Sequence, residues 1–210
     1  MLKKPNPSET VLYSAPNSLE SHAIRFIASE KDLECEVHNV EFEEMPEELI
    51  AYNPTGTMPT LFDRELILYD MTVIMEYLDE RFPFPPMLPI DPIDKAEKRT
   101  LIYRFTRAKG NWYQLVDDIL NGTKKQATES KKLLTNNLID LIPLFEYKPF
   151  FKSDTLGAVD ACIAPVLWRL EQMDIDLGSG SAAITQYSNR LFALESFQNS
   201  LTDFEKELRK

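Results

Sequence analysis

The segment NPTGTMPTLF, residues 53–62, decides the fold, because it reads as a turn that runs into a strand with a proline at the strand's entry. Pro59 cannot donate a ladder hydrogen bond, so it belongs at an edge, a bulge or a cis turn. We predict a cis Met58–Pro59 bond, which would leave the backbone of Met58 free to pair with an extended peptide. A strand-entry proline that serves no ligand is the alternative.

Working outward from this turn, the first 81 residues alternate short strands with helices. The predicted strands cover 10–15, 33–40, the run entered at Pro59, and 65–69; the predicted helices start at Ser18 and cover 43–52 and 70–81. Pro46 and the acidic residues around it favour a helix start at the second of these. The resulting order is β-α-β-α-β-β-α.

The rest of the chain reads as helical. In EKRTLIYRFTRAKGNWYQLVDDIL, residues 97–120, apolar positions step by 4, 3, 4, 3 and 4, which predicts one amphipathic helix that ends at Asn121-Gly122. Further helices are predicted over 131–147 with a kink at Pro143, over 157–173 at the centre of the helical part, and around 182–193 and 202–209, with GSGS at 178–181 as a loop. The predicted organisation is an α/β domain over 9–82, a proline-rich connection over 83–92, and an all-helical domain over 93–210.

FPFPPMLP, residues 82–89, holds four prolines in eight positions, so it forms neither helix nor central strand. A segment with preset dihedral angles loses little entropy when a partner docks on it. Phe84, Met87 and Leu88 would be costly to expose without a purpose. Two hypotheses remain open: a linker packed by its own apolar side chains, and a docking surface formed by Pro83, Phe84, Pro85 and Pro86.

The composition limits the classes of function. A net charge of −11 argues against direct binding of nucleic acid, which needs a basic surface. No apolar run approaches the ~20 residues of a membrane span, and the first residues lack the apolar core of a signal peptide. Cys35 and Cys162 lie far apart, as expected for reduced thiols in a cytoplasmic protein. With two histidines and no paired cysteines, we expect no metal site and no cofactor.

No catalytic set is recognisable from spacing. His22 and His38 have no serine, aspartate or cysteine partner at a known interval, and His22 is expected on the partly exposed side of the first helix. The carboxylates at 41, 43, 44, 47 and 48 are most simply a solvated face.

The strand order, Pro59 before the third strand, and an all-helical second half together resemble the thioredoxin-like and glutathione-transferase architecture. GAVD, residues 157–160, resembles the family's helical capping motif, in which Ser or Thr precedes Asp by three residues. Here Gly157 takes the cap position, Asp160 is expected to be structural, and Pro165 also matches. The resemblance implies a glutathione-transferase fold: a thioredoxin-like domain followed by an all-α domain.

The same resemblance places the residues of a vestigial glutathione site at Ser18, Met58, Pro59, Asp70 and Met71. Ser18 falls where many transferases activate the thiol, although it also suits a plain helix cap. Asp70-Met71 stands where the family uses Glu/Gln-Ser to hold the γ-glutamyl carboxylate. Methionine donates no hydrogen bond, so this site looks damaged. An active glutathione transferase remains the alternative function.

LILYDMTVIMEYLDERFPFPPMLPIDP (66–92) and APVLWRLEQMDIDL (164–177) resemble a bacterial branch of the family whose members associate with RNA polymerase. Phe84 departs from that branch, whose members carry His there. The resemblance implies a non-enzymatic transcription regulator of the stress response and of virulence that binds the polymerase holoenzyme, including its sigma factor. It also implies a homodimer or a heterodimer with a paralogue, with guanosine tetraphosphate at the dimer junction. Tyr103, Arg104, Arg107 and Lys109 are candidates for facing the partner subunit.

Overall fold

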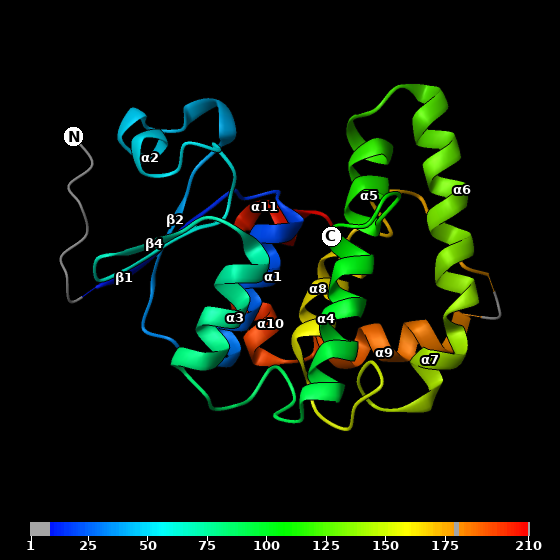
Figure 1. Ribbon diagram of the computed structural model, residues 1–210. Coiled ribbons are helices and arrows are strands. Elements are labelled where there is room, and N and C mark those ends of the chain that lie inside the picture. The colour runs from blue at the N-terminus through cyan, green and yellow to red at the C-terminus, as the bar shows by residue number, and fades with distance from the viewer. Residues whose placement is uncertain (1–8, 179–180, 210) are drawn as a thin grey trace.

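The structure, a computed structural model, describes residues 9–178 and 181–209 and joins a small sheet with its helices to a larger helical part (Figure 1). The strands are β1 (Thr10–Ser14), β2 (Glu36–Asn39), β3 (Thr60–Asp63) and β4 (Leu66–Leu68). The helices are α1 (Leu19–Glu30), the short 3-10 turn η1 (Phe42–Glu44), α2 (Glu47–Tyr52), α3 (Met71–Arg81), α4 (Pro92–Thr106), α5 (Trp112–Asn121), α6 (Lys124–Asp140), α7 (Ile142–Tyr147), α8 (Ala158–Trp168), α9 (Ala182–Phe192), α10 (Glu195–Ser200) and α11 (Asp203–Glu207). The predicted order of strands and helices in the first part is confirmed.

The sheet has the order β2-β1-β3-β4, with β1 parallel to β2 and antiparallel to β3. Side chains alternate across it, as the period of a strand requires. Leu12 and Leu61 face one another across β1 and β3 and join the core under α1 and α3. Val11 and Phe62 point to the opposite face, where they pack with Leu49 of α2. Met58–Pro59 at the entry of β3 is cis, as predicted.

One apolar core runs through both parts of the chain, because α1 of the sheet part packs against α8 and α10 of the helical part. Every residue of α8 is buried, which confirms its predicted central position. The helix is shorter than predicted, however: it ends at Trp168, and Arg169 is its C-cap. Across the described residues, no helix is long and apolar enough to cross a membrane.

The prediction of one helix over 97–120 is wrong. The chain breaks between Thr106 and Trp112, where Gly110 has a φ of +70° and Asn111 caps the next helix by accepting from the Gln114 amide at 2.9 Å. Left-handed backbone ends a helix, and glycine adopts it freely. The apolar spacing continues across the break because both helices face the same core, so the spacing alone concealed the turn.

The predicted helix over 131–147 also proves to be two. It divides at Leu141, and Pro143 lies in the first turn of α7, where a missing amide costs nothing. The capping box of Thr123 and Gln126 starts α6 seven residues before the predicted helix. Helix α10 was not predicted, and residues 179–180 of the predicted GSGS loop lie outside the described residues.

Candidate functional site

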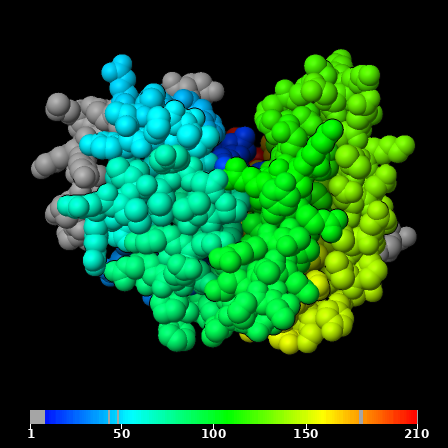
Figure 2. All heavy atoms as spheres, viewed as in Figure 1, coloured from blue at the N-terminus to red at the C-terminus, as the bar shows by residue number. Residues whose placement is uncertain are grey.

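A cleft of about 630 Å³ opens between the two parts of the chain, within the size range of small-molecule sites. Figure 2 shows the surface hollowed there, with the start of α1 at the bottom of the notch. The β1–α1 connection, the loop after β2, α5 and the end of α8 line the cleft; the lining includes Asn17, Ser18, Glu20, Glu41, Phe42, Asn111, Gln114, Asp117, Asn121 and Arg169.

The charges that line the cleft are mainly negative. Glu20, Glu41 and Asp117 come from three different segments, and the lining contains no lysine. Its one arginine, Arg169, is fully buried and donates to Glu205 Oε1 at 2.7 Å, so it presents no exposed guanidinium to a ligand. Burial raises the pKa of the Glu20 carboxyl, which Arg107 partly offsets. The cleft therefore disfavours an acidic ligand.

Ser18 is the N-cap of α1, and its Oγ accepts from the Ser21 amide at 3.2 Å. Ser18 thus has the geometry of the plain helix cap that the sequence analysis gave as one of its two roles. Of the five residues predicted for a vestigial glutathione site, Ser18 alone is among those that line the cleft. Met58, at the cis turn, is 2% exposed and packs in the core between the sheet and α2.

Asp70 caps α3, and both of its carboxylate oxygens accept hydrogen bonds. Oδ1 accepts from the amides of Thr72 at 2.8 Å and Val73 at 3.1 Å, and Oδ2 accepts from Arg107 Nη2 at 2.6 Å. Burial alone would raise the pKa of this carboxyl, but the Thr72 hydroxyl, which also donates to Oδ1, the two amides and the guanidinium hold it below its ordinary value. Met71, the next residue, is fully buried in the main core.

Arg107 lies in the turn after α4 and joins the two parts of the chain. Besides Asp70 at 2.6 Å, its guanidinium lies 3.7 Å from Glu20 on α1. Sequence analysis named Arg107 as a candidate for facing a partner subunit; in the structure its guanidinium contacts two carboxylates of its own chain, and contact with a partner stays a prediction. Its role could not be deduced from spacing, because both partners are distant in the sequence.

The proline segment, residues 82–89, presents two contrasting faces. Pro83, Phe84, Pro85 and Pro86 are exposed, and the Phe84 side chain is 82% exposed. Met87 and Leu88, in contrast, are 3% and 6% exposed and belong to the main core. The second half of the segment therefore packs as a linker, the first half is exposed, and the docking surface stays a prediction. The Phe84–Pro85 bond is also cis.

Two charged residues, Lys31 and Asp79, hydrogen-bond to the backbone of this segment on its buried side. The Lys31 side chain, at the end of α1, is fully buried and donates to Asp79 Oδ1, to the Phe82 carbonyl and to the Pro85 carbonyl at 2.7–2.8 Å. Asp79 of α3 in turn accepts from the amides of Met87 at 2.7 Å and Leu88 at 3.1 Å. Sequence analysis missed this pair, since a lone lysine at a helix end carries no signal of its partners.

A buried charged cluster lies beneath the start of α1. Glu205 is fully buried and contacts Arg25 at 2.6 Å, Arg169 at 2.7 Å and His22 Nδ1 at 3.1 Å. His22 is fully buried, so its predicted position on a partly exposed face is wrong. The sequence did carry one signal: Thr202 and Glu205 have the spacing of a capping box, which the structure forms.

Asp160 supports the start of α8. Its oxygens accept from the Gly157 amide at 2.9 Å, the Phe151 amide at 2.7 Å and the Tyr187 hydroxyl at 2.5 Å. Gly157 has no side chain to return a bond, so the capping box of the family is one-sided here.

A small, mainly apolar groove of about 200 Å³ lies between α3 and α4. Tyr103 on α4 is 58% exposed beside it, and Val73 on α3 is 50% exposed. Arg99 at its edge pairs with Glu76 at 2.7 Å. The groove is lined by two of the predicted partner-facing residues, Tyr103 and Arg107.

Comparison with family models and solved structures identifies the class of protein to which the chain belongs. The family model described as "Glutathione S-transferase, N-terminal domain" matches residues 12–86, and the one described as "Glutathione S-transferase, C-terminal domain" matches residues 86–195. Among solved structures, a rice glutathione S-transferase in complex with glutathione superposes with a TM-score of 0.82 at 20% identity, covering 96% of this chain and 94% of that one. A Trametes versicolor omega-class enzyme gives a TM-score of 0.81 at 19% identity, covering 95% and 92%. These structures show the fold.

Sequence relatives narrow the class further. A stringent starvation protein A homolog from Coxiella burnetii is 42% identical over all of this chain and 98% of its own length. One from Haemophilus influenzae is 37% identical over 92% of this chain and 91% of its own length. Rat glutathione S-transferase omega-2 is 26% identical over 76% of this chain and 65% of its own length. The chain therefore belongs to the glutathione S-transferase family and, within it, to the stringent starvation protein A group.

Proposed function

We propose that this protein is a transcription regulator that binds RNA polymerase holoenzyme, including its sigma factor, through protein contacts and catalyses no glutathione conjugation. The membership of the stringent starvation protein A group supports this function, because the resemblance to that group implies polymerase association. The net charge of −11 suits contact with a protein better than contact with DNA.

The observation that carries the proposal is the state of Asp70 and Met71. The family needs a free acceptor and a hydroxyl donor at the start of α3 to hold the γ-glutamyl end of glutathione. Here Arg107 already occupies the Asp70 carboxylate at 2.6 Å, and Met71 is buried and offers no side-chain donor. Losing one charge-assisted hydrogen bond costs roughly 1.5–3 kcal/mol, which lowers affinity about ten- to a hundredfold.

The cleft adds an electrostatic argument against the transferase. Glutathione is an acidic tripeptide, and the lining carries Glu20, Glu41 and Asp117 while its one arginine is paired internally. Repulsion between the carboxylates of glutathione and those of the lining would raise the free energy of the bound state. Ser18 remains at the start of α1, but its capping bond accounts for its presence without a thiol ligand.

The proposed docking surface is the exposed half of the proline segment, Pro83 to Pro86. Large apolar side chains that stay exposed on a folded chain commonly mark interaction sites. Phe84 is the aromatic anchor of this surface, since it is 82% exposed while its neighbours Met87 and Leu88 are buried.

The last part of the proposal concerns the subunit interface, a ligand at that interface and the cellular compartment. The groove between α3 and α4, lined by Tyr103 and Arg107 among others, is the surface expected to pair with a second subunit, either an identical chain or a paralogue. Guanosine tetraphosphate would bind at the junction of such a heterodimer, where arginine and lysine side chains of both subunits meet its phosphates. The protein would act in the cytoplasm.

A tagged pull-down from the native bacterium at moderate salt, read by mass spectrometry, tests this function. We expect polymerase subunits and a sigma factor with the wild-type protein, and their loss with the variant Phe84→Ala, Pro85→Ala, Pro86→Ala. A conjugation assay with excess glutathione is run beside it. Turnover that disappears in Ser18→Ala, together with no recovery of polymerase, would overturn the proposal in favour of the active transferase.

A further inference from the structure

We propose that Lys31 and Asp79 are positioning residues for partner binding: together they lock the proline segment in one shape and so present Phe84 as a preset aromatic anchor. The proposal rests on the proposed function, because it concerns how the same docking surface is built. Neither residue touches the partner in this scheme, and both act through the backbone of the segment.

Lys31 fixes the part of the segment that flanks Phe84. An ammonium group has three donors, and the three acceptors of Lys31 Nζ are Asp79 Oδ1, the Phe82 carbonyl and the Pro85 carbonyl. These carbonyls stand two residues before Phe84 and one residue after it. Holding both on one buried cation sets the direction in which the chain turns between them, and the Phe84 ring lies on the outside of that turn.

Asp79 fixes the end of the segment that enters the core. Because residues 83, 85, 86 and 89 are prolines, the amides of the segment beyond Phe84 are few, and the carboxylate takes those of Met87 and Leu88. A third tie comes from the helical part, where the Ala158 amide donates to the Met87 carbonyl at 2.8 Å. The segment is thus bound at both ends, by α1 and α3 on one side and by α8 on the other.

This arrangement explains how an aromatic ring can stay exposed and still be well placed. Ordering a flexible apolar segment at an interface costs conformational entropy, and a segment already fixed avoids that cost. The partner surface that fits is an apolar pocket that takes one aromatic ring, since the Phe84 side chain is 82% exposed and the Phe82 and Pro85 carbonyls on either side are already occupied by Lys31. The partner thus meets an anchor whose shape is set before binding.

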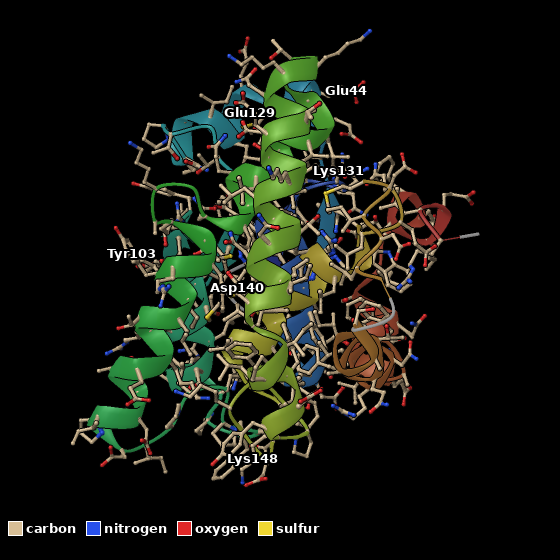
Figure 3. All side chains as sticks on the ribbon, turned by 90° about the vertical axis from the view of Figure 1, so that its right-hand side faces the viewer. Glu44, Tyr103, Glu129, Lys131, Asp140 and Lys148 are labelled. Carbon is tan, nitrogen blue, oxygen red and sulfur yellow. The ribbon has the colours of Figure 1, made fainter. Side chains whose placement is uncertain are left out.

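The test measures affinity for purified RNA polymerase holoenzyme by biolayer interferometry. Lys31→Met keeps the aliphatic stem and removes the three donors, and we expect about tenfold weaker binding. Lys131→Met is the matched control: Lys131 lies on α6 (Figure 3), and α6 lies away from the connection between α3 and α4 (Figure 1). We expect this variant to bind as the wild type does. Lys31→Arg, which keeps the charge, is expected to recover part of the loss.

A double-mutant comparison separates positioning from general stability. If Lys31 acts through Phe84, the double variant Lys31→Met, Phe84→Ala binds no more weakly than Phe84→Ala alone. Hydrogen exchange of the Met87 and Leu88 amides should also quicken in Lys31→Met while the amides of α8 keep their protection. Additive losses, or unchanged exchange in the segment, would overturn the role of Lys31.

The outcomes also distinguish this inference from the function on which it rests. If Phe84→Ala binds holoenzyme as tightly as the wild type, the docking surface itself is wrong. If Phe84→Ala weakens binding but a folded Lys31→Met does not, the surface stands and the positioning role falls. Should Lys31→Met fail to fold, Asp79→Asn, which keeps the side-chain shape, is judged by the same two criteria.

Discussion

Acidification from pH 7 to pH 5 is expected to lower the free energy of unfolding, and His22 is the main cause. The ring is fully buried in the cluster around Glu205. Burial is the largest effect that lowers the pKa of His22 from 6.5 to about 4; Glu205 opposes it, and the guanidiniums of Arg169 and Arg25 reinforce it. Nε2 has no hydrogen-bond partner among the described residues, so the folded state favours the neutral ring.

The sign and size follow from proton linkage. As the pH falls below 6.5, His22 binds a proton in the unfolded chain but stays neutral in the folded chain until about pH 4. The unfolded state therefore gains, and the fold loses about 2 kcal/mol between pH 7 and pH 5 and about 3 kcal/mol over the whole window. The pKa of Glu205 is lowered, so its own contribution is lost only below its ordinary value of 4.5.

Urea unfolding at pH 7, 6 and 5, at constant ionic strength, measures this loss. His22→Asn is the informative variant, since its amide can still donate to Glu205 but does not titrate. The sequence has two histidines, and His38, which is half-exposed, supplies the matched control His38→Asn. We expect the wild type and the control to lose stability alike and His22→Asn to lose about 2 kcal/mol less. Equal losses in all three proteins would refute the assignment to His22.

Three further predictions concern other parts of the molecule. Isothermal calorimetry should detect only weak glutathione binding to Met71→Ser alone, and about tenfold tighter binding once Arg107→Ala also frees the carboxylate of Asp70; equal affinities would show that Arg107 blocks nothing. Asp160→Ala should cost about 3 kcal/mol in urea unfolding, because it leaves buried amide and hydroxyl donors without an acceptor. Neither cysteine should react with Ellman's reagent at pH 8 until urea unfolds the chain, since burial raises the pKa of the Cys35 thiol to about 12 and that of Cys162 also rises; fast reaction of the folded protein would contradict this.

The sheet part could be predicted from the sequence because its signals are local. Strand alternation, the proline at residue 59 and the cap at Ser18 each depend on neighbours within a few residues, and the structure contains all three. In the helical part the same signals misled at residues 107–111, because two helices that face one core keep a common apolar rhythm across the turn between them. Gly110 and Asn111 are typical turn residues, but the regular spacing of apolar residues was given more weight in the prediction.

The candidate site was predicted unevenly for a related reason. The density of prolines within eight residues showed that 82–89 forms neither helix nor central strand, but it did not show which of the apolar side chains there are exposed. The partners of Lys31 lie 48 to 54 residues away along the chain, and the contact of Arg107 with Asp70 spans 37. No periodicity or motif joins residues at such separations. The pairings that shape the site exist only once the core has brought α1, α3 and α4 together.

The residues of the transferase family that remain in this chain each have a structural task that needs no ligand. Ser18 caps α1, and Asp160 satisfies two amides and a hydroxyl at the start of α8. The position whose side chain would serve glutathione alone is residue 71, and there the chain has a methionine that fills the core. The presence of Ser18 and Asp160 therefore says nothing about activity, because the fold alone requires both residues. The side chain at residue 71, together with the neighbouring carboxylate that Arg107 already contacts, is therefore the observation that bears on glutathione binding, because methionine offers no hydrogen-bond donor there.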